Sequence, residues 1–425
     1  MRFDNLREWL RWQEGLHPST IDLGLDRVAE VWRNLGPRRL PFPVVTIAGT
    51  NGKGSCAAIL ESIYSEAGYR TACYTSPHLL RYNERVRIAG REVGDADLCD
   101  SFDRIDKARD ATALTYFEFG TLAAIDLIRR AAVDIAILEV GLGGRLDAVN
   151  LFDADVALIA GIGRDHTAWL GDSLEEIARE KAGIFRSGRP AVVGHRKPAR
   201  SLLAHAHALG CRLHVLGEAF DWEPDTNGWK LLTRESPPLH LPAPALRGDV
   251  QFDNAAAVLM AVACLAKRLP VPVGGLRRGL QRIRLPGRFQ LIPGDVNWVL
   301  DVAHNAQAAE SLRDNLRSLN RQGRTHAVFG MLRDKEPTAV AGALAGLVDF
   351  WHLGRTADPR SLSSKELHDA VSRSQAEAGV REYSSIESAL AGAEAASVPT
   401  DCILVFGSFS TVEAALRRIG ERGAR

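Results

Sequence analysis

Residues 44–55 read VVTIAGTNGKGS. The first five residues are mostly β-branched or apolar, which is typical of a buried parallel strand. Three glycines follow within six positions, and apolar residues then recur at helical spacing over residues 56–66. Gly68 stands where a cap at the helix C-terminus is expected. A strand, a glycine-rich turn and a helix in this order predict the first βα unit of an α/β fold.

The turn of this unit has the composition of a phosphate-binding loop. Its backbone N–H groups and the start of the helix would point at an anion. Lys53 can reach the β- and γ-phosphates, and Ser55 can bind Mg²⁺. The spacing differs from the common pattern G-x-x-x-x-G-K-[ST], because three residues separate Gly49 from Lys53 and Gly54 precedes the serine. We still favour a phosphate loop over an ordinary turn, and therefore expect ATP and Mg²⁺ as cofactors.

The composition narrows the class of protein. A length of 425 residues suggests two or three domains. The net charge of +1 gives no support for a nucleic-acid or membrane surface. Six scattered cysteines without a C-x-x-C pair disfavour a zinc site and suit a reducing compartment. The charged N-terminus does not have the pattern of a signal peptide, and no apolar run reaches the ~18 residues of a membrane span. We expect a cytoplasmic protein and, by default, a monomer.

Strands and helices alternate along the first two thirds of the chain. This rhythm predicts a mainly parallel sheet that is covered on both faces. Residues 85–93, with Ala89-Gly90 in the middle, predict a small hairpin. Ser173 and Glu176 predict a capping box at a helix start. The other expected strands are 70–75, 134–140, 155–160 and 191–194, and the expected helices are 6–12, 20–35, 97–108, 117–131, 173–181, 254–269 and 275–283.

The last third of the chain predicts a second domain. Residues 217–248 hold five prolines, which indicates loops and edge strands. Residues 285–288 (LPGR) are typical of a domain linker. Beyond the linker the βα rhythm starts again without a glycine-rich phosphate turn, with strands expected at 298–302, 326–330, 350–353 and 402–406.

Polar residues follow several of the predicted strands at their carboxyl ends, where open α/β sheets bind ligands. Ser76, Glu139 and His166 each follow or end a strand, and Ser55 opens the first helix. A carboxylate inside an apolar strand is costly unless it is paired or binds a cation. Two interpretations of Glu139 stay open: a metal ligand, or a salt bridge to Arg145 or Lys53. His166 is either a structural histidine or a second metal ligand.

Other candidate residues are ambiguous from their pattern. Lys181, in the helical stretch REKAG, is typical of a solvated helix face. Tyr116, Phe117 and Phe119 suit a hydrophobic core, and Phe119 most of all. Asp301 and His304 follow the apolar stretch NWVL in the second domain and therefore lie at the carboxyl end of a strand. Physical reasoning thus reaches an enzyme that uses ATP and Mg²⁺, without its substrate.

Ten stretches together are far more specific than the phosphate loop alone. They are TIDLGLDRV (20–28), TIAGTNGKGS (46–55), TSPHLLRYNERVRI (75–88), TYFEFGTLAA (115–124), LEVGLGGRLDAVN (138–150), DHTAWLG (165–171), REKAGIFR (179–186), GRFQ (287–290), DVAHN (301–305) and FGSFSTV (406–412). On these stretches the chain resembles the bifunctional dihydrofolate synthase/folylpolyglutamate synthase family of Mur ligases. The resemblance implies an N-terminal P-loop ATPase domain with a mainly parallel sheet over 1–286 and a smaller C-terminal Rossmann-like α/β domain over 287–425.

The resemblance also implies roles for individual residues. It implies catalytic roles for Lys53, Lys181 and His304. It implies binding of ATP by Asn51, Gly52, Lys53, Gly54, Ser55, Asn254, Arg288 and Asp301. It implies two Mg²⁺ ions held by Ser55, Ser76, Glu139, His166 and a carbamylated Lys181. It implies binding of the pteroate by Asp22, Leu23, Gly24, Leu25, Thr115, Tyr116, Phe117, Glu118, Leu146, Asp147 and Ala148, where an aromatic ring at Phe117 suits stacking on a pterin.

The family's chemistry defines the expected substrates. A substrate carboxylate attacks the γ-phosphorus of ATP and becomes an acyl phosphate, and the amino group of L-glutamate then forms an amide. The expected acceptors are dihydropteroate, which becomes dihydrofolate, and folates, which become folylpolyglutamates. One alternative is a cell-wall amino-acid ligase of the Mur type, although we expect its uridine-nucleotide domain to need more than the 43 residues before Val44. Another is a nucleotide-binding regulatory protein with little turnover.

Overall fold

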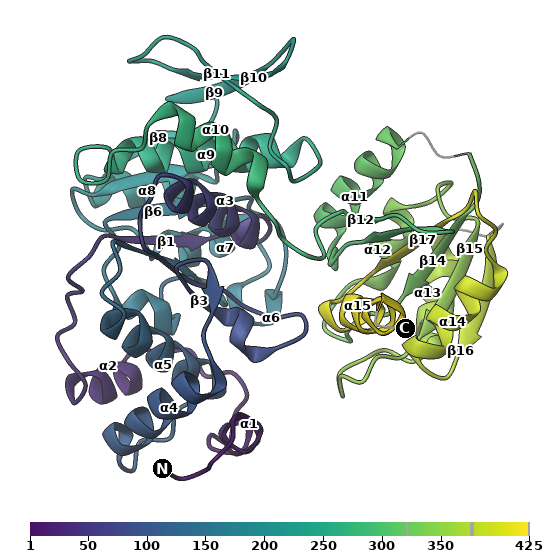
Figure 1. The fold of residues 1–425 in the computed structure, drawn as a ribbon, viewed down its shortest axis with the longest axis horizontal. Coiled ribbons are helices and arrows are strands. Elements are labelled where there is room, and N and C mark those ends of the chain that lie inside the picture. Colours follow the sequence, from purple (N-terminus) through teal and green to yellow (C-terminus); the bar gives the residue numbers. More distant parts are fainter. Residues whose placement is uncertain (320–321, 375–377, 424–425) are drawn as a thin grey trace. The chain divides into compact units, whose positions relative to one another are not determined.

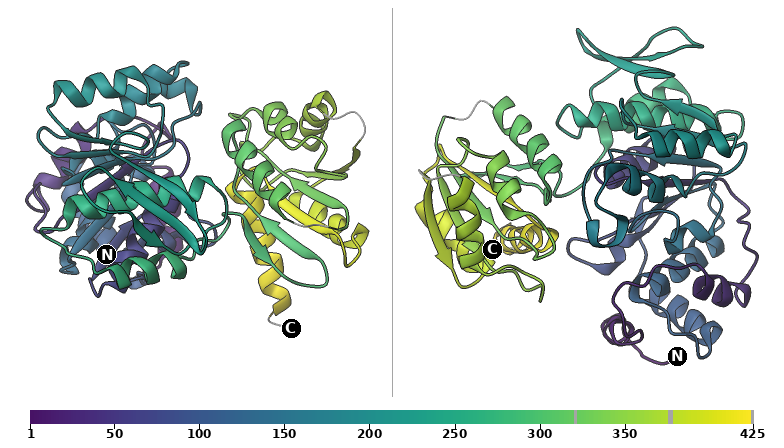
Figure 2. Two further views of the ribbon diagram at one scale, coloured as in Figure 1. Left: turned by 90° about the horizontal axis from the view of Figure 1, so that it is seen from above. Right: turned by 180° about the vertical axis from the view of Figure 1, so that it is seen from behind.

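The structure is a computed structural model that describes residues 1–319, 322–374 and 378–423. The chain forms two units (Figures 1 and 2). The first contains residues 1–245 and 251–283, and the second contains residues 246–250 and 284–425. The sequence-based boundary between 286 and 287 thus lies three residues after the start of the second unit's long segment, and the short segment 246–250 was not anticipated.

The first unit is built on a mixed, mainly parallel sheet with the strand order β4-β3-β2-β5-β1-β6-β7-β8. The six strands β2-β5-β1-β6-β7-β8 are parallel to their neighbours. At one edge of the sheet, β3 pairs with β2 and β4 pairs with β3 in the antiparallel direction. That edge is the hairpin predicted at residues 85–93. The strands are β1 Val44–Ala48, β2 Thr71–Tyr74, β3 Val86–Ile88, β4 Arg91–Glu92, β5 Ile135–Glu139, β6 Val156–Ile159, β7 Pro190–Val193 and β8 Arg212–Val215.

Strand β1 lies between β5 and β6, and β2 lies on the far side of β5. In register, Ile47 is opposite Glu139, and Ala48 is opposite Ile159. All five residues of β1 are buried. The turn after β1 is therefore flanked by the loops that follow β5 and β6. The carboxyl ends of β2, β5, β1 and β6 form a continuous row, as expected for the ligand-binding edge of an open α/β sheet.

Helices cover both faces of this sheet. Figure 1 shows α3 (Lys53–Glu66), α9 (Val250–Leu265) and α10 (Val273–Arg282) on one side and α1, α2, α4 and α5 on the other. Close packing of α10 on α3 requires glycine, because a Cβ at Gly279 would lie 2.6 Å from the Ile63 Cα. The remaining helices of the unit are α1 Leu6–Glu14, α2 Asp26–Arg33, α4 Asp95–Arg109, α5 Tyr116–Arg130, α6 Thr167–Leu170, α7 Leu174–Ala182 and α8 Arg200–Ala208, with the 3-10 helices η1 Tyr82–Arg85 and η2 Ala148–Leu151.

Three observations bear on the sequence predictions for this unit. Phe119 is fully buried and contacts Trp9 and Phe102, so its assignment to the core is confirmed. Ser173 caps α7 in the predicted capping box. The proline-rich segment folds into a separate antiparallel sheet of β9 (Phe220–Asp225), β10 (Gly228–Thr233) and β11 (Leu239–Leu241).

The second unit has a six-stranded sheet within its described residues, in the order β12-β13-β17-β14-β15-β16. Only β12 is antiparallel to its neighbour. Helices α11, α12 and α13 share one apolar core with the sheet. Helix α14 contacts β14, β15 and β16, and α15 contacts β17. The strands are β12 Gln290–Ile292, β13 Asn297–Leu300, β14 Thr325–Phe329, β15 Phe350–Gly354, β16 Gly379–Tyr383 and β17 Cys402–Phe406, and the helices are α11 Ala306–Ser318, α12 Pro337–Ala343, α13 Ser364–Ser374, α14 Ile386–Ala396 and α15 Phe409–Gly423.

Across the described residues, no helix combines the length and the apolar character that crossing a bilayer requires.

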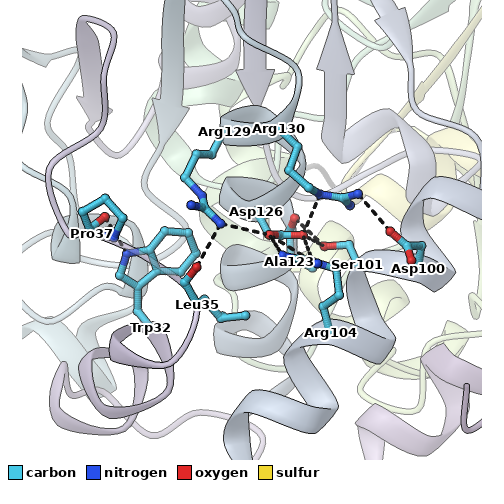
Figure 3. A network of polar contacts seen from close by, with 10 residues as sticks. All are labelled: Trp32, Leu35, Pro37, Asp100, Ser101, Arg104, Ala123, Asp126, Arg129 and Arg130. Atoms are coloured by element: carbon cyan, nitrogen blue, oxygen red, sulfur yellow. Dashed lines mark hydrogen bonds and ion pairs between the residues drawn. The ribbon is translucent and has the colours of Figure 1, made fainter.

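A buried carboxylate links three helices on one face of the first unit's sheet (Figure 3). The Asp126 side chain in α5 is fully buried. It accepts hydrogen bonds from Ser101 Oγ at 3.1 Å and Arg104 Nε at 3.2 Å, both in α4, and pairs with Arg130 Nε at 3.0 Å. Arg129 lies 3.7 Å from the same carboxylate and donates to the Leu35 carbonyl just beyond α2. One aspartate therefore links α2, α4 and α5.

We expect Asp126→Asn to lower the free energy of unfolding by about 2–3 kcal/mol, because a buried charge that satisfies several donors is removed. The matched control is Asp100→Asn, since Asp100 is 54% exposed and, among the described residues, pairs with Arg130. Its cost should stay below about 1 kcal/mol. Urea unfolding followed by circular dichroism measures both values, and equal losses for the two variants would contradict this account.

Candidate active site

The turn after β1 forms an anion cradle. Gly49 and Gly52 have φ angles of 153° and 89°, and Gly52 precedes α3 without any side-chain cap. The first N–H groups of α3 therefore remain directed at an anion position. A Cβ at Gly52 would lie 2.6 Å from Asn254 Oδ1, so glycine is required and Asn254 is held beside the turn. The residues of the predicted phosphate loop and Asn254 are thus brought together.

The loop after β6 fixes this turn in place. The Thr50 and Asn51 N–H groups both donate to the Gly161 carbonyl, at 2.7 and 3.2 Å. Thr50 Oγ1 donates to the Gly163 carbonyl at 2.9 Å. His166 lies three residues further along, with a φ of 51°, at the start of α6. The tip of β6 is therefore attached directly to the phosphate loop, and His166 belongs to that tip.

Two lysines converge on one carbonyl of the turn. Lys53 Nζ and Lys181 Nζ each donate to the Gly49 oxygen at 3.1 Å, and Lys53 also donates to the Thr50 oxygen at 3.2 Å. Lys181 is only 4% exposed, so our pattern-based interpretation of it as a solvated residue was wrong. It lies on the buried face of α7, which packs against the loop after β5: a Cβ at Gly144 would lie 3.0 Å from the Lys181 Cα.

The environment of Lys181 changes its acid–base behaviour. Burial, and then the positive charge of Lys53, lower the pKa of the Lys181 ammonium from 10.5 to about 7. Asp165 and Asp147 oppose this shift with their negative charges. A sizeable fraction of Lys181 is therefore a neutral amine at neutral pH.

Glu139 ends β5 at the neighbouring strand tip and is 5% exposed. Its Oε2 accepts a hydrogen bond from the Ser76 N–H at 3.3 Å, so the tips of β2 and β5 meet. Arg145, one of the two salt-bridge partners we considered for Glu139, pairs with Glu180 at 2.9 Å. Ser55 is buried in the first turn of α3. The predicted metal ligands therefore lie on neighbouring strand ends and the adjoining helix.

The predicted cation site is not built from acidic, histidine and cysteine side chains alone. No group of three or more such side chains could hold a metal ion in residues 1–319, 322–374 and 378–423. The predicted set contains only Glu139 and His166 of these types and is completed by two serines and a lysine. It is therefore a mixed set with one carboxylate, one imidazole, two hydroxyls and one amine.

The predicted pteroate residues form a second cluster in the same unit. Arg27 in α2 pairs with Asp22 at 2.9 Å and with Glu118 at 3.0 Å. Thr115 Oγ1 caps α5 by accepting from the Glu118 N–H at 3.2 Å. Arg27 therefore joins segments 22–25 and 115–118, and sequence reasoning missed this link. Leu23, Gly24 and Leu25 are all partly exposed in the segment that leads into α2.

Aromatic rings line the adjoining surface. Tyr116 contacts Tyr82 edge-on with 5.9 Å between ring centroids, and the Arg85 guanidinium lies 5.1 and 5.6 Å from the centroids of the Tyr82 and Tyr116 rings. Phe117 is partly exposed and packs on the loop after β5, because a Cβ at Gly141 would lie 2.5 Å from its ring. A flat aromatic ligand could therefore contact Phe117 close to that strand tip.

Asp147 has a positioning role in the loop after β5. Its carboxylate accepts three backbone hydrogen bonds, from Gly141 at 3.0 Å and from Leu142 and Val149 at 2.9 Å. It is 2% exposed, and burial raises the pKa of the carboxyl to about 6. Leu146 and Ala148 flank it in the chain. Asp147 thus determines the shape of the loop that contacts Phe117.

The nucleotide residues predicted in the second unit also form a cluster within that unit. The Arg288 guanidinium lies 5.3 Å from the Phe409 ring, and the His304 ring lies 6.2 Å from it. Asp301 accepts hydrogen bonds from the Phe289 and Ala303 N–H groups, both at 2.8 Å. Burial raises the pKa of the Asp301 carboxyl, although the charge of Arg288 opposes this. Phe409 was not singled out in the sequence.

Comparison with known proteins decides the family. The dihydrofolate synthase/folylpolyglutamate synthase of Escherichia coli (strain K12) is 41% identical over 418 residues, which cover 98% of this chain and 96% of the relative. The chain belongs to the dihydrofolate synthase/folylpolyglutamate synthase family. Two Mur ligase models match as well: the middle domain over residues 47–222 and the glutamate ligase domain over residues 287–409.

Solved structures of the family agree with the fold. E. coli FolC in complex with DHPP and ADP has a TM-score of 0.93 and 40% identity, and 99% of each chain is covered. A bifunctional folylpolyglutamate synthase/dihydrofolate synthase with Mn, AMPPNP and L-glutamate bound has a TM-score of 0.89 and 41% identity, with 98% of each chain covered. The predicted fold class and family are therefore confirmed, and family membership replaces the cell-wall ligase alternative.

We expect the metal-free, nucleotide-free protein to gain stability between about pH 7 and about pH 9, in part through Lys181. The folded-state pKa lies below the ordinary value, so the unfolded chain binds a proton that the folded chain lacks across this window. Stability that depends on this group therefore rises with pH. Lys181→Met should remove up to about 2 kcal/mol of that rise, as measured by urea unfolding at both pH values. Identical rises in the two proteins would contradict the assigned environment.

Proposed function

We propose that this protein is an ATP-dependent ligase that joins L-glutamate to dihydropteroate and to folates. The observation that carries the proposal is the connection between the phosphate loop and the aromatic surface within one unit. The loop after β5 begins beside the phosphate loop, and its Gly141 packs on Phe117. An acceptor that stacks on Phe117 would therefore have its carboxylate directed along this loop toward the γ-phosphate.

The residues present fit a triphosphate. The uncapped start of α3, the left-handed Gly52 and two lysines on one carbonyl all favour an anion at this turn. We assign the triphosphate to residues 51–55, with Asn254 alongside. Arg288, Asp301 and His304 of the second unit are proposed to contact the nucleotide as well.

The donor set also fits a hard cation, since it offers a buried carboxylate, two hydroxyls and an imidazole. We propose that Ser55, Ser76, Glu139 and His166 hold two Mg²⁺ ions. When bound, the ions would offset negative charge on the transferring phosphoryl group. Lys53 contributes a fixed positive charge at the same place. The acceptor carboxylate becomes an acyl phosphate, ADP leaves, and the amino group of L-glutamate displaces phosphate to give the amide.

Lys181 is proposed to become carbamylated. Carbamylation requires a neutral amine, and the low pKa of Lys181 supplies one near neutral pH. The product is an anion beside Lys53, which would replace a repulsion by an attraction and add an oxygen ligand for Mg²⁺.

Carbon-13 NMR of the folded protein in labelled bicarbonate should detect the carbamate on Lys181, since the adduct loses carbon dioxide once the protein is digested or acidified. Mg²⁺ binding should weaken when carbon dioxide is removed. The arginine variant Lys181→Arg is the control, because a guanidinium cannot form the adduct under these conditions. If removal of carbon dioxide weakens Mg²⁺ binding equally in both proteins, the proposal fails.

We expect phosphate release only when dihydropteroate or a folate, L-glutamate, ATP and Mg²⁺ are all present. Coupled detection of phosphate and chromatography of the pteridine product measure the reaction. Lys53→Ala should abolish turnover while circular dichroism stays unchanged, since it removes the charge next to the transferring group. Phosphate release without glutamate, or no product from any pteridine acceptor, would count against the ligase.

We further propose that the protein acts in the cytoplasm. Its six cysteines remain thiols, which suits a reducing compartment.

A further inference from the structure

Three polar side chains form a hydrogen-bonded chain beside the phosphate loop. The Cys56 thiol in α3 donates to Asn254 Oδ1 at 3.5 Å, and Asn254 Nδ2 donates to Gln251 Oε1 at 3.1 Å. Asn254 and Gln251 are three positions apart in α9 and therefore share one face of the helix. Helices α3 and α9 lie on the same side of the sheet (Figure 1). These side chains thus connect the helix that follows the phosphate loop to α9.

All three side chains are buried. Cys56 is 0% exposed, Asn254 is 5% exposed and Gln251 is 7% exposed. The thiol also lies 4.0 Å from the Asn254 carbonyl oxygen, so it faces the first turns of α9. A Cβ at Gly52 would lie 2.6 Å from Asn254 Oδ1, which places the middle of the chain directly against the phosphate loop. Polar groups that are buried this deeply are held in one arrangement by their hydrogen bonds.

A chain of two amides can run in either direction, and Cys56 selects one of them. If both amides turned over together, Gln251 Nε2 would donate to Asn254 Oδ1, and the bond between the two residues would be kept. Asn254 Nδ2 would then face the thiol, and sulfur is a weak acceptor. In the direction that the structure shows, the thiol donates to the buried amide oxygen, which needs a donor. The thiol at position 56 therefore determines the direction of the whole chain.

This direction decides which groups are left for a ligand. Gln251 Oε1 accepts from Asn254, so the Gln251 Nε2 group stands at the end of the chain. In the part of the chain that the structure describes, Gln251 Nε2 has no hydrogen-bond partner. Asn254 Nδ2 carries a second N–H as well. The two amides therefore offer donors, whereas the reversed arrangement would offer a carbonyl oxygen.

We propose that Cys56 is a positioning residue for the nucleotide, because it directs the N–H groups of Asn254 and Gln251 toward ATP. This inference rests on the proposed function, in which Asn254 lies alongside the triphosphate, and deepens it. The phosphate oxygens and ring nitrogens of ATP are acceptors, so they match N–H donors and would be repelled by a carbonyl oxygen. The fully buried thiol acts through Asn254.

The test is a double-mutant cycle on nucleotide binding. Calorimetric titration with AMPPNP and Mg²⁺ gives the Kd of the full-length wild type, Cys56→Ala, Asn254→Ala and the double variant. We expect Cys56→Ala alone to raise the Kd about three-fold, as for the loss of one weak hydrogen bond. In the Asn254→Ala protein the same change should leave the Kd as it is, because the thiol no longer has an amide to orient.

A second variant and a control accompany the cycle. Gln251→Met removes the end of the chain and should raise the Kd about five-fold, and it replaces Cys56→Ala if that variant does not fold. Cys99→Ala removes a buried thiol of α4, on the other face of the sheet, and should leave the Kd unchanged. Urea unfolding of each variant separates binding from stability, since a purely structural thiol would change the free energy of unfolding and not the Kd.

The outcomes distinguish this inference from the proposed function. A folded wild type that binds no AMPPNP would overturn the proposed function together with this inference. A wild type that binds AMPPNP, with a Kd that Cys56→Ala leaves unchanged or raises equally in both backgrounds, would overturn this inference alone. If Cys56→Ala does not fold, an unchanged Kd in Gln251→Met has the same meaning.

Discussion

The turn after β1 holds two positively charged amino groups close together, and their repulsion is the main physical constraint on the candidate site. Lys53 and Lys181, from helices more than 120 residues apart in the chain, direct their amino groups at the same Gly49 oxygen. Two ammonium groups this close repel each other, and burial of Lys181 adds a desolvation cost. The negative charges of Asp165 and Asp147 offset part of this repulsion, and a neutral Lys181 or an anion at the turn would offset more of it.

The sheet topology explains how these groups come together. Because β1 lies between β5 and β6 with β2 beyond β5, one edge of the sheet collects four consecutive strand tips. Hydrogen bonds join two pairs of neighbouring tips: the Thr50 N–H donates to the Gly161 carbonyl, and the Ser76 N–H donates to the Glu139 carboxylate. Rigid strands thus hold the polar groups, while the glycine turn supplies the amides. The buried network around Asp126 fixes α5, and therefore Thr115 and Phe117, on the same frame.

The sequence was most informative where local pattern and tertiary environment agree. Buried parallel strands, the glycine turn and the capping box at Ser173 were predicted, since each has a local signature. Strands β8 and β16 were not, because edge strands with partly exposed, polar side chains lack an apolar run. The burial of Lys181 and the Arg27–Glu118 pair depend on residues distant in sequence, and no periodicity of α7 or α2 indicates them. Family resemblance supplied those roles that pattern alone left open.

One loop transmits geometry between the two halves of the candidate site. Residues 141–147 form the loop that follows β5. The Asp147 carboxylate accepts hydrogen bonds from the Gly141 and Leu142 N–H groups at the start of this loop and from the Val149 N–H group in η2. At Gly141 the loop packs on Phe117, and at Gly144 it packs on the backbone of Lys181. Neither position can accept a Cβ without displacing its neighbour, so the loop has little freedom. The loop therefore joins Phe117 on one side of the candidate site to Lys181, which donates to the Gly49 carbonyl, on the other.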